Sequence, residues 1–480
     1  MSTAAQPAIA VRTLPAGRWA GPAILAADIA ALEIAFVLGL ALRRILSGWL
    51  PAYVGFDQYA GIAAGILFLP IINYQIGLYP GYLLGAVERL RRRTLATLAV
   101  FGGLAAWDLI FARGVLSRGV LLATLLFALV IPPLAETGAR AILIRRNAWG
   151  IPALLLGSGS AGRAVAQALL RERHLGVRPI AFLDNRPDAW QSTFDGVPVV
   201  GPLGLASDFE GHADVAIVCL ADLAKTDDAA AVLQELNFPR VIVVPDLAGI
   251  VNLWVTARNL GGSLGFEIKR NLLLRRNHAL KTLMDVAIAL PLFLASLPVI
   301  VLAAIWIKLV SRGPVFYRQM REGMHGCRIP VWKLRTMRVD GDRILDEWFQ
   351  SHPADREEWR QHFKLRRDPR ILPVIGPLLR RSSLDELPQL WSVLRGRMSL
   401  VGPRPLPDYH LREFSAEFRS LRTKVLPGLT GLWQVSARSD GDLRAHEALD
   451  SFYIRNWSPW LDLYILARTV AAVLLGRGAY

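Results

Sequence analysis

The sequence predicts a membrane protein of three parts: a bundle of four transmembrane helices, a central parallel α/β domain, and a mostly α-helical C-terminal domain with a membrane-embedded segment of its own. Three observations predict this architecture. Four long apolar stretches fill the first 140 residues, short apolar runs then alternate with helical stretches, and the chain after residue 310 is dense in charge and in glycine-proline turns. A chain of 480 residues is also too long for one ordinary core.

The composition narrows the class of protein. Hydrophobic residues make up 53% of the chain, and 55 lysines and arginines against 39 aspartates and glutamates leave a formal net charge of +16. This pairing is typical of a membrane protein with basic cytoplasmic faces. The sequence has no zinc-finger spacing, no homeodomain-like helix set and no basic-aromatic stripe, so we expect no nucleic-acid partner. Cys219 and Cys327 lie far apart, which favours a reducing compartment over a disulfide framework or a zinc site.

We assign residues 1–145 to the transmembrane bundle, because each apolar stretch approaches the ~20 residues that cross a ~30 Å hydrocarbon core. The stretches are about 22–42, 60–80, 94–112 and 115–137. Arg12 and Arg18 precede the first stretch, Arg89–Arg93 follows the second, and further arginines from Arg140 onward follow the fourth. Positive charge marks cytoplasmic loops, so both ends of the bundle are predicted to face the cytoplasm.

Residues 146–265 are predicted to form the α/β domain. Short apolar runs flanked by helical sequence indicate the strands of a parallel sheet. These runs are Ala153–Leu156, Ile180–Leu183, Val215–Leu220 and Val241–Val244.

A glycine-rich run, Gly157-Ser-Gly-Ser-Ala-Gly162, follows the first of these strands, and Asp184 ends the second. The layout matches the fingerprint of Rossmann-like dinucleotide domains, in which glycines let a phosphate approach the N-terminus of a helix. Gly157, Gly159, Gly162 and Asp184 are therefore the candidate nucleotide-binding residues. The same glycines also serve a tight turn and close helix packing, so a structural or regulatory module stays open beside nucleotide binding.

The segment of about residues 283–310 is apolar and long enough to span a membrane, yet Pro291 and Pro298 interrupt it. A proline removes a helix hydrogen bond and kinks the helix, and Ser296 stands where it could satisfy a freed carbonyl. Lysines and arginines flank both ends of the segment, which indicates that both ends lie on one face of the membrane. We predict a broken, re-entrant helix, with a plain fifth span carrying a proline kink as the alternative.

The C-terminal domain, residues 266–480, contains five phrases that combine charged residues with glycine and proline. Together they supply anion-binding cations and one carboxylate pair, Asp385 and Glu386. The phrases are Ser311–Arg318, Lys333–Met337, Arg380–Leu390, Ser399–Pro405 and Pro427–Gln434.

The carboxylate pair precedes an apolar helical repeat, and a proline three residues on is tolerated only in the first turn of a helix, so a helix is predicted to begin near Asp385. The dipole of such a helix favours the ionised carboxylate that a nucleophile or a magnesium ligand needs. Ser383 and Glu386 also fit a capping box, which is a purely stabilising pattern. Arg380 and Arg404 favour a phosphate site, because fixed arginines beside a fixed carboxylate suit phosphate binding.

The stretch from Asn277 to Tyr480 resembles the polyprenyl-phosphate hexose-1-phosphate transferases of bacterial polysaccharide assembly, since all five phrases match the pattern of that family. The bundle and the Rossmann-like domain resemble the larger members, and the closing run Gly476-Arg-Gly-Ala-Tyr480 most resembles the undecaprenyl-phosphate galactose phosphotransferases. The resemblance implies a phosphoglycosyl transferase of the bacterial inner membrane, with a cytoplasmic catalytic domain, that serves O-antigen, capsule or exopolysaccharide synthesis.

The resemblance also implies the chemistry. Asp385 would attack the sugar-bearing phosphate of a UDP-sugar and form a covalent aspartyl ester while UMP leaves, and undecaprenyl phosphate would then accept the sugar phosphate. Asp385 and Glu386 would hold Mg²⁺, which neutralises the diphosphate, and Glu386 could instead assist proton handling. The implied hexose is galactose, with glucose as the alternative. Membrane lipid is a further partner, and the oligomeric state, a homodimer included, is left open.

Several further residues are candidates by the same resemblance. The candidate ligands of the substrate phosphates are Lys333, Arg335, Arg380 and Arg404. Each of these cations could instead meet anionic lipid headgroups, and we assign Arg318 and Arg321 to that interfacial role. Trp433 and Gln434 are candidates for contact with the base or the sugar, although a tryptophan near a membrane surface also serves as an anchor.

Two rival functions use the same bundle and glycine-rich run. A membrane-tethered, NAD-dependent dehydratase or epimerase needs a tyrosine followed four residues later by a lysine, and no tyrosine of this chain is so followed. A non-enzymatic scaffold or regulator of polysaccharide assembly would have no use for Asp385. Both rivals are therefore disfavoured.

Overall fold

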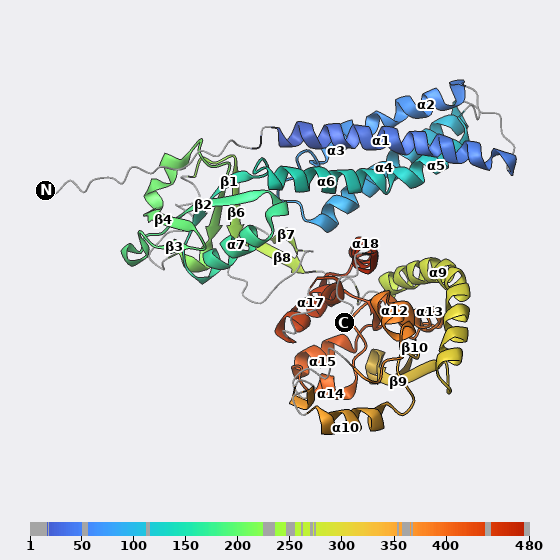
Figure 1. Ribbon diagram of the computed structural model, residues 1–480. Helices are drawn as coiled ribbons and strands as arrows, with labels where there is room; N and C mark the ends of the chain where they lie inside the picture. The colour runs from blue at the N-terminus through green and yellow to red at the C-terminus, as the bar shows by residue number, and fades with distance from the viewer. Residues whose placement is uncertain are drawn as a thin grey trace. The chain divides into compact units, whose positions relative to one another are not determined.

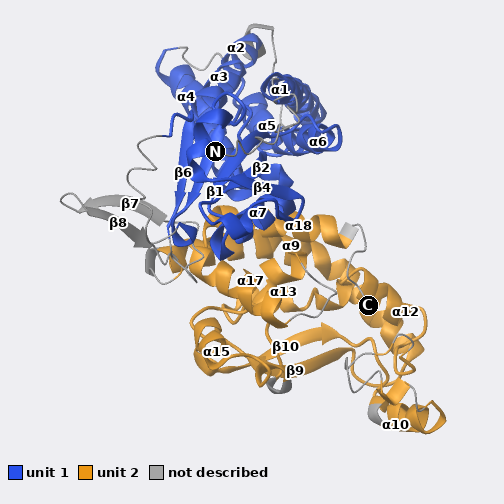
Figure 2. Cartoon of the chain, turned by 90° about the vertical axis from the view of Figure 1, so that its left-hand side faces the viewer, with its two compact units in different colours: residues 1–249 blue, residues 250–480 orange. Residues whose placement is uncertain are grey.

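The computed structural model describes residues 17, 19–49, 56–111, 116–223, 236–245, 255–260, 263–268, 272, 275–352, 355–357, 365, 368–436 and 443–474. Arg12, Arg18 and the closing run 476–480 lie outside the described residues. The chain divides into two compact units, residues 1–249 and 250–480, coloured blue and orange in Figure 2. The first unit holds the bundle and the α/β domain, and the second holds the C-terminal domain.

Helices form the predicted N-terminal bundle. They are α1 Ala20–Ile45, α2 Phe56–Ile66, α3 Phe68–Gln75, α4 Ala86–Ile110, α5 Arg118–Ala128 and α6 Ile131–Arg145. Helix α1 packs along α5 and α6 (Figure 1), and Leu32, Phe101 and Val120 lie in the shared apolar core. By length and composition α1, α4 and the α5–α6 pair can each cross a membrane, whereas the apolar stretch of α2 and α3 is shorter. The four apolar helical segments are confirmed.

The structure corrects the position of Arg89–Arg93, which the sequence predicts in a loop after the second span. The run lies inside α4 instead. Glu88 accepts hydrogen bonds from Arg91 at 3.1 Å and from Arg92 at 2.8 Å, and such pairs three and four residues apart stabilise a helix. The first and last arginines of the run are buried, so they are not the loop cations that the orientation argument counts.

A buried polar network crosses the bundle. Arg93 of α4 forms ion pairs with Glu136 of α6, at 2.8 Å between Nη2 and Oε2, and with Asp28 of α1. Arg140 also pairs with Glu136, and Asn73 donates to Asp28 at 3.1 Å. An unpaired charge among apolar helices is costly, so the network stabilises only the arrangement that brings α1, α4 and α6 together.

The α/β domain is built on a six-stranded sheet of order β3-β4-β2-β1-β5-β6. The strands are β1 Ile151–Leu156, β2 Val177–Leu183, β3 Thr193–Phe194, β4 Val197–Gly201, β5 Val215–Cys219 and β6 Arg240–Val244. Neighbouring strands pair in parallel except β3 and β4, which pair antiparallel. Leu154 and Leu155 belong to different buried clusters, as alternation along a strand requires when both faces are covered. The α/β domain is confirmed, and the narrower Rossmann-like assignment stays a prediction.

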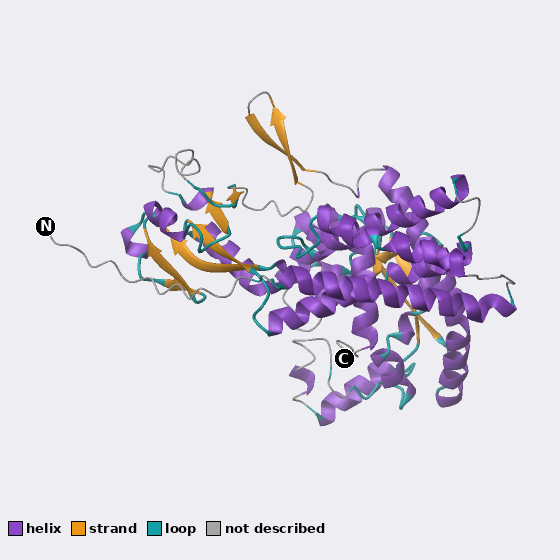
Figure 3. Ribbon diagram, turned by 90° about the horizontal axis from the view of Figure 1, so that it is seen from above, coloured by secondary structure: helices purple, strands orange, loops and turns teal. Residues whose placement is uncertain are grey.

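Among the described residues of the second unit, helices predominate and the strands pair two by two. Figure 3 colours the helices of the chain purple and its strands orange. The strands are β7 Val255–Leu260, β8 Ser263–Ile268, β9 Phe316–Glu322, β10 Arg328–Leu334, β11 Ser399–Val401 and β12 Gly428–Thr430. The helices are α9 Arg275–Val310, α10 Gly341–Ser351, α12 Ile375–Arg381, α13 Gln389–Leu394, α14 Asp408–Leu411, α15 Ala416–Arg422, α16 Leu432–Ser436, α17 Leu443–Asn456 and α18 Pro459–Leu474.

Helix α9 contains the apolar segment for which the sequence predicts a broken, re-entrant path. The helix runs through Pro291 and Pro298 without a break and follows a curved course in Figure 1. The Ser296 hydroxyl donates to the carbonyl of Phe293 at 2.8 Å, one residue before the carbonyl that Pro298 leaves without its usual partner. Only 22% of the apolar stretch of α9 is buried, which leaves a long apolar surface for lipid. The predicted break is therefore a bend, and the re-entrant path stays a prediction.

The N-terminal end of α9 is fixed to the rest of the second unit by buried polar contacts. Lys281 Nζ lies 2.8 Å from Asp462 Oδ2 of α18, and the Tyr453 hydroxyl donates to Asp462 Oδ1 at 2.8 Å. One turn further along, Asp285 accepts a hydrogen bond from the Ser399 hydroxyl of β11 at 2.7 Å. These contacts connect the membrane-type helix to the strand that leads into Gly402–Pro407.

Candidate active site

The predicted carboxylate pair lies in a short 3-10 turn, Leu384–Glu386, between α12 and α13. The turn packs against β10 on one side and α12 on the other. The Asp385 side chain is 12% exposed and the Glu386 side chain is 20% exposed. The fold therefore keeps both carboxylates largely out of water.

The structure decides between the two interpretations of Ser383 and Glu386. Ser383 adopts a left-handed backbone, φ +56°, and its side chain makes no capping hydrogen bond. The capping box is therefore not formed. Helix α13 begins at Gln389, with Pro388 as its N-cap, so the predicted helix start near Asp385 is four residues too early. A left-handed conformation at a non-glycine residue costs about 1–3 kcal/mol, and such residues cluster at active sites.

Two predicted cations meet the carboxylate pair. Lys333 of β10 places its Nζ 2.6 Å from Glu386 Oε1 and 3.9 Å from Asp385 Oδ2. Arg404, from the loop after β11, places Nη2 3.5 Å from the same Glu386 oxygen. Glu386 thus binds Lys333 closely and Arg404 at the limit of hydrogen-bond length, whereas the distance from Lys333 to Asp385 exceeds that length. The oxygens of Asp385 remain less engaged than those of its neighbour.

The other two predicted phosphate ligands lie in different surroundings. Arg380, at the end of α12, donates from Nε to the Thr336 hydroxyl at 3.0 Å, and its charge lowers the pKa of Asp385. Arg335 is buried, and its guanidinium donates to the carbonyl and the hydroxyl of Ser311 at 3.0 and 3.1 Å. Arg380 therefore belongs to the electrostatic surroundings of the pair, and Arg335 holds the chain that leaves α9.

The two carboxyl groups titrate in opposite directions. Burial raises the pKa of Asp385 above its ordinary value; the Lys333 ammonium opposes this rise and the Glu386 carboxylate adds to it. Burial would also raise the pKa of Glu386, but Lys333 and Arg404 outweigh it and lower that pKa to about 2. The sequence-based expectation that a helix start favours ionised Asp385 is wrong in sign, because loss of water around the carboxyl outweighs the nearby cations.

Trp433 and Gln434 lie in α16. Trp433 stacks on His446, with ring centroids 4.0 Å apart and planes 9° from parallel. Gln434 is buried and donates from Nε2 to the carbonyl of Leu429 at 3.4 Å. One face of the Trp433 ring is therefore covered by His446, and the proposed contact of these two residues with a base or sugar stays a prediction.

The glycine-rich run of the α/β domain leads from β1 into α7, Ser160–Arg171, as predicted, but two of its amides at the start of α7 bind a carboxylate. The carboxylate of Asp222, which follows β5, accepts hydrogen bonds from the backbone N–H groups of Ala161, at 3.1 Å, and Gly162. A Cβ at Gly159 would lie 2.3 Å from Asp222 Oδ1. The missing side chain there lets the aspartate in, so a carboxylate of the same domain fills the place where a phosphate would bind.

Asp184 is likewise engaged within the domain. Its carboxylate accepts hydrogen bonds from the backbone N–H and the hydroxyl of Ser158 at 2.8 and 2.7 Å, and from Arg186 Nη2 at 2.8 Å. Burial opposes ionisation of Asp184, but these hydrogen bonds outweigh it and hold its pKa well below the usual range. These contacts favour the structural role of the glycine-rich run that the sequence leaves open.

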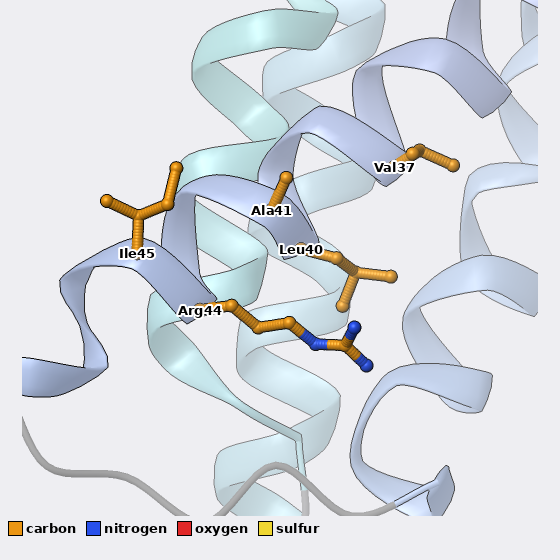
Figure 4. Close-up of a pocket in the computed structure, with 5 residues that line it drawn as sticks. All are labelled: Val37, Leu40, Ala41, Arg44 and Ile45. Carbon is orange, nitrogen blue, oxygen red and sulfur yellow. The ribbon is translucent and has the colours of Figure 1, made fainter.

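A shallow hollow lies on α1 in the first unit, lined by Val37, Leu40, Ala41, Arg44 and Ile45 (Figure 4). Leu40 and Arg44 are four residues apart and lie on one face of the helix. Four of the five lining side chains are apolar, so the hollow offers too few polar groups to orient a sugar or a phosphate.

Magnesium is the ion that the sequence implies for Asp385 and Glu386. In the part of the chain that the structure describes, no three His, Cys, Asp or Glu side chains gather as a metal site. Two adjacent carboxylates nevertheless fit Mg²⁺, which proteins often hold with one or two carboxylates while substrate phosphates and water supply the other ligands. The donor set therefore fits an ion that arrives with a phosphate-bearing substrate.

A carboxylate pair that gathers a lysine and an arginine suits the binding of phosphate-bearing groups, and the same unit contains an apolar helix long enough to cross a membrane. Residues 276–476 match the family model described as bacterial sugar transferase. The chain belongs to this family.

Similar proteins agree with the assignment. The chain is 33% identical, over 81% of each chain, to the undecaprenyl-phosphate galactose phosphotransferase of Salmonella typhimurium. It is 38% identical, over 42% of each chain, to the UDP-glucose:undecaprenyl-phosphate glucose-1-phosphate transferase of Escherichia coli. It is also 46% identical to the exopolysaccharide production protein ExoY of Sinorhizobium fredii, over 41% of this chain and 86% of that protein. The enzyme is therefore a transferase of polysaccharide synthesis.

We expect the purified protein not to bind NADH. The Asp222 carboxylate already accepts hydrogen bonds from the first amides of α7, and its charge repels anions from them. A fluorescence titration of NADH in detergent measures this, and a saturable signal from the α/β domain would contradict it.

Asp222→Ala should lower the free energy of unfolding by about 1.5–3 kcal/mol through loss of charged hydrogen bonds. Asp188→Ala, at an exposed position of the same domain, is the control and should leave stability unchanged.

Proposed function

We propose that the protein transfers hexose-1-phosphate, with galactose-1-phosphate as the first candidate, from a UDP-sugar to undecaprenyl phosphate. The products would be undecaprenyl-diphosphate-sugar and UMP, in the first membrane step of O-antigen, capsule or exopolysaccharide synthesis. The observation that carries the proposal is the arrangement of Asp385, nearly buried and loosely bound, beside Glu386, Lys333 and Arg404. The galactose relative, which aligns over most of both chains, supports the choice of sugar.

In the first step an oxygen of Asp385 attacks the sugar-bearing phosphorus of the UDP-sugar. A new oxygen–phosphorus bond forms, the bond from that phosphorus to the bridging oxygen breaks, and UMP leaves with the electron pair. Lys333 and Arg404 are near enough to meet the negative charge that develops on the phosphate oxygens and the leaving group. The raised pKa of Asp385 fits a more nucleophilic carboxylate than an exposed one.

In the second step an oxygen of undecaprenyl phosphate attacks the same phosphorus. The bond to Asp385 breaks, the carboxylate is regenerated, and the sugar phosphate passes to the lipid with its charge unchanged. The exposed apolar surface of α9 supports access to such a lipid substrate. Two steps through one covalent intermediate give ping-pong kinetics.

Asp385 and Glu386 are the residues that would hold Mg²⁺, which would supply charge neutralisation at the diphosphate of the donor. Lys333 and Arg404 would also neutralise charge on the diphosphate, because their contacts with Glu386 keep both cations beside the carboxylate pair. Glu386 in this arrangement orients the cations and leaves the attack to its neighbour.

Glucose-1-phosphate is the second candidate for the transferred group, because the Escherichia coli relative with 38% identity is named for UDP-glucose. That match covers 42% of each chain, whereas the match to the galactose relative covers 81% of each. The longer match is the reason for placing galactose first.

We also propose that the protein is a multi-pass protein of the bacterial inner membrane whose catalytic unit faces the cytoplasm, where nucleotide sugars are made. A re-entrant α9 would return to the face it entered, and the bend at its prolines supports that path. Asp385 would then lie on the same face as Arg89–Arg93.

Asp385→Asn is expected to abolish turnover, because the amide cannot form the covalent ester, whereas Glu386→Gln should retain a residual rate of the ester-forming step. The measurement is the formation of radiolabelled lipid-linked sugar from UDP-galactose and from UDP-glucose in parallel. Quenching with acid should trap radiolabelled phosphosugar on the wild-type protein and not on Asp385→Asn.

Undiminished lipid-linked product from Asp385→Asn would sink the mechanism. Asp346→Asn, at a carboxylate of α10 in the same unit, is the matched control and should behave as wild type. EDTA should stop turnover and added Mg²⁺ should restore it, so full activity in EDTA would remove the metal from the proposal.

Activity should fall on the acid side with a midpoint above the ordinary aspartate pKa of about 3.9, because burial raises the pKa of Asp385 and only its ionised form attacks. Lys333→Gln should move that midpoint to higher pH, since the lysine charge lowers the same pKa. The pH profile of kcat/KM measures both effects. Lys424→Gln, at an exposed lysine, is the control, and an unmoved midpoint in Lys333→Gln would exclude Asp385 as the titrating group.

The native cysteines test the membrane orientation without further substitution. Cys327 is exposed in the turn between β9 and β10, and Cys219 is buried in the α/β domain. A membrane-impermeant thiol reagent should label Cys327 in inverted membrane vesicles and leave it unlabelled in right-side-out vesicles. The reverse pattern would favour a plain fifth span, and Cys327→Ser is the control for the identity of the labelled thiol.

A further inference from the structure

The segment Gly402-Pro-Arg-Pro-Leu-Pro407 carries Arg404 into the candidate site, and its prolines pose a structural problem. Proline has no backbone N–H, so three of the six residues cannot donate to a neighbouring strand. The carbonyls of the segment still need partners wherever water is excluded, and most of the segment is buried. The position of Arg404 therefore depends on donors from elsewhere in the chain.

Those donors come from three separate elements. The backbone N–H of Gly428 donates to the carbonyl of Pro403 at 2.9 Å, and that of Glu322 donates to the carbonyl of Leu406 at 3.4 Å. Between them, Arg422 Nη2 donates to the carbonyl of Arg404 at 2.6 Å. Arg321 Nη1 donates to the carbonyl of Pro405 at 2.6 Å. Four consecutive carbonyls are thus bound, the middle two by guanidinium groups.

Arg422 makes this contact from a buried position, and burial of a charged guanidinium is unfavourable. It ends α15, is 5% exposed, and has its Nε 3.6 Å from Glu322 Oε2. The hydrogen bond to the Arg404 carbonyl satisfies one donor of this buried guanidinium and Glu322 balances its charge, while Nη1 has no hydrogen-bond partner among the described residues. Its position beneath the Arg404 backbone therefore fits a specific holding role better than general surface solubility.

The side chain of Arg404 is held more loosely than its backbone. It is 33% exposed, and its contact to Glu386 is 3.5 Å long. A rigid backbone with a partly free guanidinium suits a group that must leave a carboxylate and meet a phosphate when substrate binds. The fold therefore fixes where Arg404 starts while leaving its charged end available.

We propose that Arg422 and Arg321 are positioning residues that act through Arg404. Arg422 binds the carbonyl of Arg404, and Arg321 binds the carbonyl of Pro405. This proposal rests on the proposed function, in which Arg404 meets the diphosphate of the donor. It also replaces the interfacial role that the sequence assigns to Arg321.

A double-mutant cycle on the full-length protein in detergent tests the proposal. Arg404→Gln should lower kcat/KM for the UDP-sugar by a factor of about 10²–10³, the usual loss when one preorganised donor to a developing charge is removed. Arg422→Gln should lower kcat/KM at least tenfold in the wild-type background and less than twofold in the Arg404→Gln background. Two residues that act as one unit give such non-additive losses.

Arg422→Lys is the rescue variant, since an ammonium can still donate to the Arg404 carbonyl, and it should retain more activity than Arg422→Gln. Arg419→Gln, at an exposed arginine one turn earlier on α15, is the matched control and should leave kcat/KM unchanged. If Arg422→Gln does not fold, Arg321→Gln enters the same cycle, because its guanidinium is only half-buried.

The outcomes separate this proposal from the proposed function. Losses that multiply in the double variant would overturn the positioning role while a dead Asp385→Asn still supports the transferase mechanism. An Arg404→Gln variant with wild-type kcat/KM would overturn both the positioning role and the assignment of Arg404 as a phosphate ligand. Lipid-linked product from Asp385→Asn would overturn the mechanism itself.

Discussion

Two consecutive carboxylates, Asp385 and Glu386, lie together in a poorly hydrated turn, and the ammonium of Lys333 makes that arrangement tolerable. Its 2.6 Å contact with Glu386 joins β10 to the turn and balances one of the two charges. Asp385 is left with a contact of 3.9 Å, so its oxygens stay less engaged. The proposed mechanism depends on this unequal sharing, since a symmetrical pair bound equally by the lysine would have no distinct nucleophile.

Arg404, the second cation beside the carboxylate pair, is positioned through backbone carbonyls of its own segment. Prolines rigidify the segment that carries Arg404 and remove its own donors, and Arg321 and Arg422 supply the donors that are missing. At the N-terminal end of that segment, Ser399 of β11 donates a hydrogen bond to Asp285 of α9. A helix suited to lipid, a strand and a cationic loop are therefore connected by a short series of buried polar contacts.

In the first unit, buried charges are satisfied within the unit. Arg93 and Glu136 pair across the helices of the bundle, and Asp222 accepts from the amides that begin α7. In both places a carboxylate stabilises the fold by neutralising groups that would otherwise need water or a ligand. A glycine-rich run can thus keep the spacing of a phosphate-binding loop while its amides bind an aspartate of the same domain.

The sequence alone determined the apolar segments, the alternating α/β pattern, the carboxylate pair and two of its cations, because hydropathy and short motifs are local properties. Tertiary structure decided what desolvation and distant partners control. Burial reversed the expected pKa shift of Asp385, Ser311 took the guanidinium of Arg335, and Asp222, 60 residues from Gly162, filled the amides of α7. Nothing in the residues around Arg422 marks it, since its contact with Arg404 exists only when α15 folds against the proline-rich loop. A hydrogen bond between residues far apart in the chain leaves no periodic trace in the sequence.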